Sequence, residues 1–199
     1  LLKISIICKG AWKAKNPMGV MLEPMNHINI HYYNKNTRSI QIVSNIEIIQ
    51  PFSHFNNELN KLVIGQIIVD LLDKTTIENN PSPILYRLCY KVLEKLSQTE
   101  TNPINLINFY IYQLALRLGF MPNIKYCNLC NSNNDVYFID QNIYKIICKK
   151  CITSNSIELS NSAISILNDL TNLHLNELYN NKYNKNDLIL IFKILKTFI

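Results

Sequence analysis

The stretch Cys127-Asn128-Leu129-Cys130, with Cys148-Lys149-Lys150-Cys151 seventeen residues later, decides how the middle of this chain folds. Two residues between paired cysteines let both thiolates face one metal ion, and the intervening segment is long enough for a hairpin that brings the pairs together. Four sulfur ligands leave no coordination position for water or substrate, so the ion would stabilise the fold. The spacing predicts one structural Zn²⁺ on Cys127, Cys130, Cys148 and Cys151, with an iron–sulfur cluster or a redox-active dithiol as alternatives.

Between the cysteine pairs the sequence predicts two short strands, over residues 136–139 and 144–147. Together with the cysteines they would form a zinc ribbon over residues 124–152. Lys145, Lys149 and Lys150 flank the second pair and would offset the negative charge of four thiolates.

Helical periodicity surrounds this segment on both sides. Before it, helices are expected over residues 59–73, 83–96 and 103–118, and after it from about Ser160 and over residues 186–198. The first of these is nearly all apolar and is expected to be buried. Pro83 suits a first helical turn, while Gly119 followed by Pro122 is the expected order for a helix end.

The first 50 residues follow the period of two that is typical of strands. Short strands are expected over residues 4–8, 28–33, 39–43 and 46–49, separated by turn residues that include Gly10, Gly19 and Pro24. These features predict a compact β module, such as a small barrel. Because a strand pattern is already present at the first residue, which is not Met, we expect the natural chain to begin earlier.

Composition limits the class of protein further. Hydrophobic residues make up 48% of 199 positions, enough for a sizeable core, and no apolar run approaches the roughly 18 to 20 residues that cross a bilayer. Cys8 and Cys89 stand alone in apolar patterns, which favours a reducing compartment and a cytoplasmic protein without a membrane partner. The net charge of +6 suits a polyanionic partner, although an AT-rich genome would also enrich lysine.

The β module is the candidate nucleic-acid surface. Residues 1–50 contain six basic and two acidic side chains and so carry +4 of the net charge. Cations and flat aromatic rings together are what a single strand needs, for its phosphates and its bases. The candidate DNA-binding residues are Lys9, Trp12, Lys13, Lys15, Lys35 and Arg38, with Tyr32 and Tyr33 nearby. The alternative is that a tyrosine packs inside the barrel and the lysines only solvate the surface.

No residue pattern for catalysis is present. None of the four histidines stands in a metal-ligand spacing, and there is neither a Gly-x-Ser-x-Gly motif nor a phosphate-binding glycine loop. The nearest acidic pairs, Asp70 with Asp73 and Asp135 with Asp140, are expected to be exposed loop or helix-end residues. We therefore expect no catalytic residues and a protein that is not an enzyme.

The chain contains three characteristic segments in a fixed order, over residues 9–15, 19–25 and 116–122, and together they resemble the RecO family of bacterial recombination mediators. Lys9-Gly10-Ala11, with Lys13 and Lys15, is similar to the family's Lys-Gly-Ala-Arg-Lys run. Residues 19–25 resemble its Gly-Ala-Leu-Leu-Gln-Pro-Phe segment, and residues 116–122 resemble the Leu-Gly-Tyr-x-Pro helix end that precedes the family's ribbon. The resemblance covers residues 4–151 and, more loosely, the last helices.

This resemblance implies an α+β protein with an N-terminal OB-fold-like β barrel, incomplete at its start, over residues 1–50. A helical domain over residues 51–199 would carry the four-cysteine zinc ribbon. The implied function is DNA repair and homologous recombination in the bacterial cytoplasm, in association with the nucleoid. Family members bind single- and double-stranded DNA, anneal complementary strands, bind single-stranded DNA-binding protein (SSB), and work with RecR and RecF to load RecA. Lys9, Lys13 and Lys15 match the family's basic DNA contacts.

The chain departs from the family pattern at two places. Asn108-Phe109-Tyr110-Ile111 stands where many relatives have Arg-Arg-Phe-Glu, and Trp12 stands where they have arginine. Two other functions remain open: a protein-interaction module that binds no DNA, and a zinc-ribbon enzyme that modifies nucleic acid.

Overall fold

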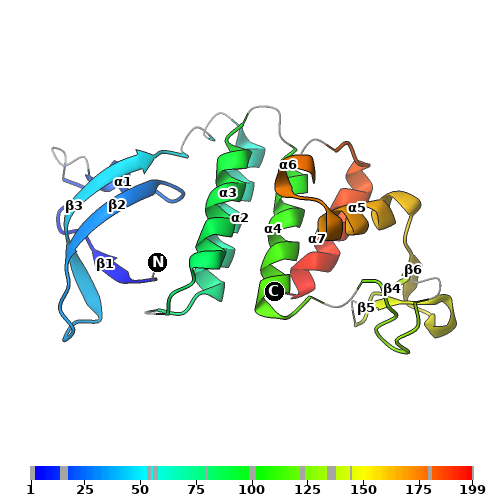
Figure 1. Ribbon diagram of the computed structural model, residues 1–199. Helices are drawn as coiled ribbons and strands as arrows, with labels where there is room; N and C mark the ends of the chain where they lie inside the picture. The colour runs from blue at the N-terminus through cyan, green and yellow to red at the C-terminus, as the bar shows by residue number, and fades with distance from the viewer. Residues whose placement is uncertain are drawn as a thin grey trace. The chain divides into compact units, whose positions relative to one another are not determined.

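The chain contains two compact units, Leu1–Glu100 and Thr101–Ile199. The structure is a computed structural model that describes residues 3–13, 18–52, 55, 58–78, 80–98, 102–121, 124–133, 138–143, 145–178 and 181–198. Helices and strands occur in both units, as expected for an α+β protein (Figure 1). The division into domains over residues 1–50 and 51–199 stays a prediction.

The first unit begins with a three-stranded sheet of order β1-β3-β2. Its strands are β1 (Ser5–Ile7), β2 (His27–Tyr33) and β3 (Ile40–Gln50), and the last two form a long curved hairpin (Figure 1). β2 is antiparallel to β3, whereas β1 is parallel to it, with Ser5 opposite Ile40 and Ile7 opposite Ile42.

The two strands expected over residues 39–43 and 46–49 are in fact one continuous strand, β3. The alternation of apolar residues fails at Ser44 because the pairing with β2 shifts there: His31 lies opposite Asn45, but Tyr32 lies opposite Val43. Ser44 is the extra residue of this bulge, and its hydroxyl donates to the carbonyl of His31 at 3.0 Å. The prediction of two separate strands was wrong because a bulge also interrupts the period of two.

Gly19 was expected to break the chain, but it lies in the short helix α1 (Met18–Met21) and is buried. The left-handed backbone that favours glycine occurs instead at Gly10, with φ 73°. The Gly19–Met25 segment is thus a helical turn and a loop that lead into β2, and it contains no strand among the described residues.

Two helices complete the first unit, α2 (Leu59–Thr75) and α3 (Pro83–Leu96), which pack against each other. α3 has the predicted bounds, with Pro83 in its first turn. The six apolar positions predicted from its periodicity are all buried: Leu85, Leu88, Cys89, Val92, Leu93 and Leu96. The expectation that α2 is buried on all sides was wrong, because Leu59 is 71% exposed and Val63 is 48% exposed.

Side chains at and just before β1 connect the sheet to the end of α2 and to the segment that follows it. The Lys3 ammonium lies 2.9 Å from the Asp73 carboxylate and also donates to the backbone carbonyl of Asp73 at 2.6 Å. Ser5 donates to the carboxylate of Glu78. A cation at the C-terminal end of a helix interacts favourably with its unpaired carbonyls. Lys3 therefore stabilises the end of α2 and also attaches the sheet to it.

The second unit is built on α4 (Pro103–Leu118), against which α5 (Asn161–Asn172), α6 (Leu175–Leu178) and α7 (Lys185–Leu195) pack. A 3-10 turn, η3 (Lys196–Phe198), follows α7. α4 ends as predicted at Gly119, whose φ of 78° is left-handed; Pro122 lies outside the described residues. α6 was not predicted.

Two buried asparagines fix the position of α4 within the second unit. The Asn105 amide donates to the carbonyl of Asn181 at 2.9 Å, and the Asn108 amide donates to that of Leu188 at 3.0 Å. Both side chains are at most 1% exposed. Since a buried amide N–H is costly without an acceptor, these contacts hold α4 in one register against Asn181 and the first turn of α7.

A small antiparallel sheet of order β5-β4-β6 lies between α4 and α5 in the chain. Its strands are β4 (Phe138–Asp140), β5 (Lys145–Ile147) and β6 (Ser156–Glu158). The first two agree with the prediction over the residues described, while Val136, Tyr137 and Tyr144 lie outside them. β6 was not predicted. We call residues 124–158 the cysteine module. In the part of the chain described, no helix is both long and apolar enough to cross a membrane.

Candidate metal centre and nucleic-acid surface

The first cysteine pair lies in a tight turn that is fixed to the small sheet. Asn131, in the left-handed region with φ 57°, donates its N–H to the carbonyl of Cys127 at 2.9 Å. Asn128 pairs with Ile146 of β5, donating its backbone N–H to the Ile146 carbonyl at 2.9 Å and accepting the Ile146 N–H on its side chain at 3.2 Å. These bonds hold the first pair beside β5.

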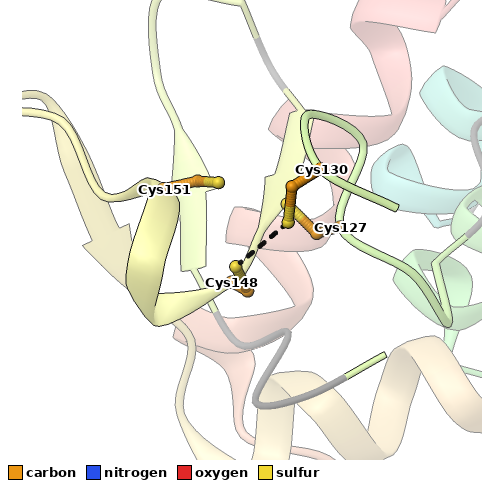
Figure 2. Close-up of side chains that lie close together, drawn as sticks. All are labelled: Cys127, Cys130, Cys148 and Cys151. Atoms are coloured by element: carbon orange, nitrogen blue, oxygen red, sulfur yellow. Dashed lines mark hydrogen bonds between the residues drawn. The ribbon is translucent and has the colours of Figure 1, made fainter. Parts of the chain in front are cut away.

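The second pair follows β5 directly. Cys148 ends the strand, and the 3-10 turn η2 (Lys149–Cys151) returns Cys151 toward it, with the Cys151 N–H donating to the Cys148 carbonyl at 2.9 Å. Figure 2 shows the four side chains coming together from these two turns. All four sulfur atoms lie within 4.8 Å of one another.

The distances between sulfurs fit tetrahedral ligation. Sulfurs at about 2.3 Å from one zinc ion stand about 3.8 Å apart, and the Cys130 and Cys148 sulfurs are 3.6 Å apart. A disulfide would bring two sulfurs to about 2 Å, and the six cysteines are free thiols. The donor set therefore fits a soft or borderline metal ion such as Zn²⁺.

The surroundings of the first cysteine pair lower the pKa values of both its thiols. Hydrogen bonds from the Ser132 side chain and backbone lower the pKa of Cys130 to about 6. Burial opposes ionisation of Cys127, but backbone N–H groups outweigh it and lower the pKa of that thiol. Hydrogen bonding to Cys130, together with burial, raises the pKa of Cys151 to about 12. Four adjacent thiolates need a cation, because like charges this close resist joint ionisation.

The hydrophobic core of the cysteine module is small and includes two of the proposed ligands. Cys127, Cys148 and Ile147 form its buried centre, with Phe138 and Cys151 packed against it. Lys145, Lys149 and Lys150, which flank the second pair in the sequence, are exposed. So small a core cannot fix a fold by itself, and a metal ion would supply the missing stabilisation.

Asp140 was expected to be exposed, but it is a buried part of the cysteine module, 3% exposed. Its carboxylate accepts the N–H of Asn142 at 2.8 Å and the hydroxyl of Thr153 at 2.6 Å, and these bonds lower its pKa. It thus ties the β4–β5 turn to the segment before β6. An Asp two residues before a turn Asn is a signal that could have found this role. Asp135 lies outside the described residues.

The candidate DNA-binding residues of the first unit lie on two separate loops. Lys9, Trp12 and Lys13 are exposed in the loop that follows β1, and Lys35 and Arg38 are exposed in the β2–β3 turn. β1 runs parallel to β3, so both strands lead away from the β2–β3 turn. The loop after β1 therefore begins at the end of β1 that is farther from that turn. Lys15 lies outside the described residues.

The β2–β3 turn is held by a side chain that the sequence did not single out. The Gln41 amide accepts the Lys35 N–H at 3.0 Å and donates to the carbonyls of Lys35 and Arg38, at 3.2 and 2.8 Å. These bonds fix the backbone that carries two of the candidate cations. Tyr32, next to this turn, is half-buried, whereas Tyr33 is 63% exposed.

The segment that departs from the family pattern in α4 is buried. Asn108, Phe109, Tyr110 and Ile111 are each at most 8% exposed, and Asn108 is hydrogen bonded inside the second unit. These four side chains are therefore part of the core of the second unit.

Comparison with known proteins identifies the family. The family model described as "Recombination protein O C terminal" matches residues 56–199, which is more than half of the chain. A protein named DNA repair protein RecO from Salinibacter ruber is 30% identical over 122 residues, or 61% of this chain and 47% of the relative. The Acetivibrio thermocellus protein of that name is 22% identical over 89% of this chain and 71% of its own length. A third protein of that name, from Listeria monocytogenes, is 24% identical over 75% of this chain and 57% of its own length.

The chain thus spans between about half and seven tenths of the length of these curated relatives. The range matched by the family model contains the helices of the second unit and the four clustered cysteines. By these matches, the chain belongs to the RecO family.

Proposed function

We propose that this protein is a DNA repair and homologous recombination mediator. It binds single- and double-stranded DNA, anneals complementary strands, and with RecR helps load RecA onto DNA coated with SSB. The observation that carries the proposal is the match of most of the chain to proteins named DNA repair protein RecO. RecR, SSB, RecA and RecF are the protein partners that this function requires, and the mediator needs no catalytic turnover.

The exposed loops of the first unit suit contact with a DNA backbone. Lys9 and Lys13 on one loop, with Lys35 and Arg38 on the other, can neutralise phosphates without reading sequence. Lys15 belongs with the first group by its place in the sequence. A protein that holds a strand by its phosphates leaves the base edges free to find a complement, which is what annealing requires.

Two structural proposals accompany this function. The sheet of the first unit is part of an OB-type barrel, an assignment supported by the parallel pairing of β1 with β3, since a simple meander pairs only antiparallel neighbours. The four cysteines hold one Zn²⁺ as a zinc ribbon, supported by sulfurs within 4.8 Å of one another. The ion would stabilise the cysteine module and supply no chemistry.

The test is binding of a labelled oligonucleotide across a salt series, with a strand-annealing readout. We expect salt-steep binding, and the Lys9→Ala/Lys13→Ala variant should lower both the affinity and the salt slope, the slope by roughly one per lost phosphate contact. The matched control is Lys182→Ala/Lys185→Ala, which removes two exposed lysines from the other unit. Its effect should be smaller.

Absence of binding at low salt would overturn the proposal and favour a protein-interaction module. Cleavage or modification of the oligonucleotide on addition of a divalent metal would favour an enzyme. If the two double-lysine variants weaken DNA binding equally, the loop after β1 is not a specific part of the DNA-binding surface.

A further inference from the structure

Trp12 is the most exposed of the large hydrophobic side chains that the structure describes, at 83%. It is also the only tryptophan in the chain. An indole in water leaves a large apolar area unburied, which marks the position as a candidate contact surface. Its neighbours on the loop, Lys9 and Lys13, are exposed cations.

The loop that carries Trp12 has a defined shape. Ala11 donates its N–H to the Cys8 carbonyl at 3.4 Å, and Lys13 donates to the Gly10 carbonyl at 3.1 Å, which gives two overlapping turns. Gly10 has a left-handed φ of 73°, and the Lys13 side chain lies close over it. Ala11 is 5% exposed, so the loop is anchored at its centre while Trp12 and Lys13 point to solvent.

Gly19 of α1 provides the surface against which this loop rests. A methyl group added to Gly19 would lie 2.8 Å from the Ala11 carbonyl oxygen and 3.1 Å from Cε3 of Trp12. Any side chain at this position would therefore push the loop and the indole away. The absence of a side chain at Gly19 lets one edge of the indole contact the helix backbone while most of the ring stays accessible.

We propose that Trp12 makes this protein prefer unpaired over paired DNA by stacking on a base, and that Gly19 is the residue that positions its indole. The proposal rests on the proposed DNA-binding function. Lysines contact phosphates in single strands and duplexes alike. The face of a base, however, is available to an aromatic ring in a single strand and is covered by neighbouring bases in a duplex. Stacking also leaves the pairing edges of that base free.

The size of the expected effect follows from the strength of stacking on one base, whose loss lowers affinity about 5- to 150-fold. Trp12→Ala should lower the affinity for an unstructured oligo-dT by a factor in this range and change the affinity for a duplex of equal length much less. Trp12→Phe should recover part of the loss. Phe120→Ala is the matched control, since Phe120 is an exposed aromatic residue (61%) of the other unit.

Fluorescence gives a second readout, because all tryptophan emission comes from residue 12. Oligo-dT should quench the emission strongly and the duplex weakly. Gly19→Ala should change the accessibility of the indole to acrylamide and reduce the preference for oligo-dT, with circular dichroism checking that the variant is folded. If Gly19→Ala unfolds, the stacking role of Trp12 is tested by the affinities of Trp12→Phe and Trp12→Ala for oligo-dT. Equal affinities of these two variants would overturn it.

The outcomes separate the two proposals. If the protein binds oligo-dT and duplex and Trp12→Ala lowers both affinities equally, or neither, the stacking role is overturned while the DNA-binding function stands. If the protein binds neither DNA, both proposals fail. A selective loss on oligo-dT, with quenching by that strand, supports both.

Discussion

Removing the metal ion is expected to unfold the cysteine module and leave helices α4, α5 and α7 folded. The module has three nearly inaccessible isoleucines, Ile139, Ile146 and Ile147, which contribute roughly 2 kcal/mol each when buried. Binding of a structural zinc ion contributes about 10 to 16 kcal/mol. The proposed ion would therefore be the largest stabilising contribution to the module, and we expect the module not to remain folded on its apolar contacts alone.

The helices have a core of their own, because α4, α5 and α7 pack on one another and each buries at least four side chains. Hydrogen exchange measured by mass spectrometry, with and without a chelator, is the assay. We expect amides of residues 124–158 to lose protection and those of α4 to keep it. Cys148→Ser should behave like the chelated protein and bind no zinc, whereas Cys8→Ser should bind one ion per chain.

DNA affinity per folded molecule should change less than stability, because the candidate DNA residues lie in the other unit. The reasoning would be refuted if chelation left the exchange of the module unchanged. Loss of protection throughout α4 would refute the prediction that the helical core remains folded without the cysteine module.

Three further predictions concern single side chains. Asp140→Asn should destabilise the cysteine module at neutral pH; because hydrogen bonds lower the Asp140 pKa, the stability it contributes is present above about pH 4 and is lost as pH falls through the folded pKa. Melting temperatures of the two proteins that fail to converge at low pH would contradict this. In the metal-loaded protein Cys8 should react with a thiol reagent and Cys89 should not, because burial raises the pKa of Cys89 to about 12. If the metal-loaded Cys8→Ser variant still consumed one equivalent of the reagent, this prediction would be contradicted. Asn108→Ala should lower the free energy of unfolding by about 0.5 to 1.5 kcal/mol, because it removes the buried hydrogen bond from the Asn108 amide to the Leu188 carbonyl, and unchanged denaturant midpoints would disprove it.

Local signals in the sequence were sufficient for the helices with strong ends. Pro83 and Pro103 stand at the first turns of α3 and α4, and Gly119 ends α4 with a left-handed φ of 78°. Each proline fixes its own φ, and glycine adopts the left-handed conformation of a helix end without a steric penalty, so no knowledge of distant contacts was needed. The spacing of the cysteines likewise placed four sulfurs together, because each pair forms its own turn.

Features that depend on distant partners could not be predicted. β6 has three residues and exists because Phe138 to Asp140 pair with it, which no local pattern reveals. Asp140 is buried through Thr153, thirteen residues away. Gln41 acts by folding back on the turn that precedes it, and a glutamine in a strand has no pattern that distinguishes this role.

The attachment of β1 affects the order in which the first unit can form. Its Lys3 anchor is separated from Asp73 by 70 residues, and its partner strand begins at Ile40. Loop closure of this length costs entropy before any contact repays it, and pairings between distant segments form slowly. On the ribosome, β1 would emerge before β3 and α2 and could dock fully only after them, since its anchor does not exist until the end of α2 has been synthesised.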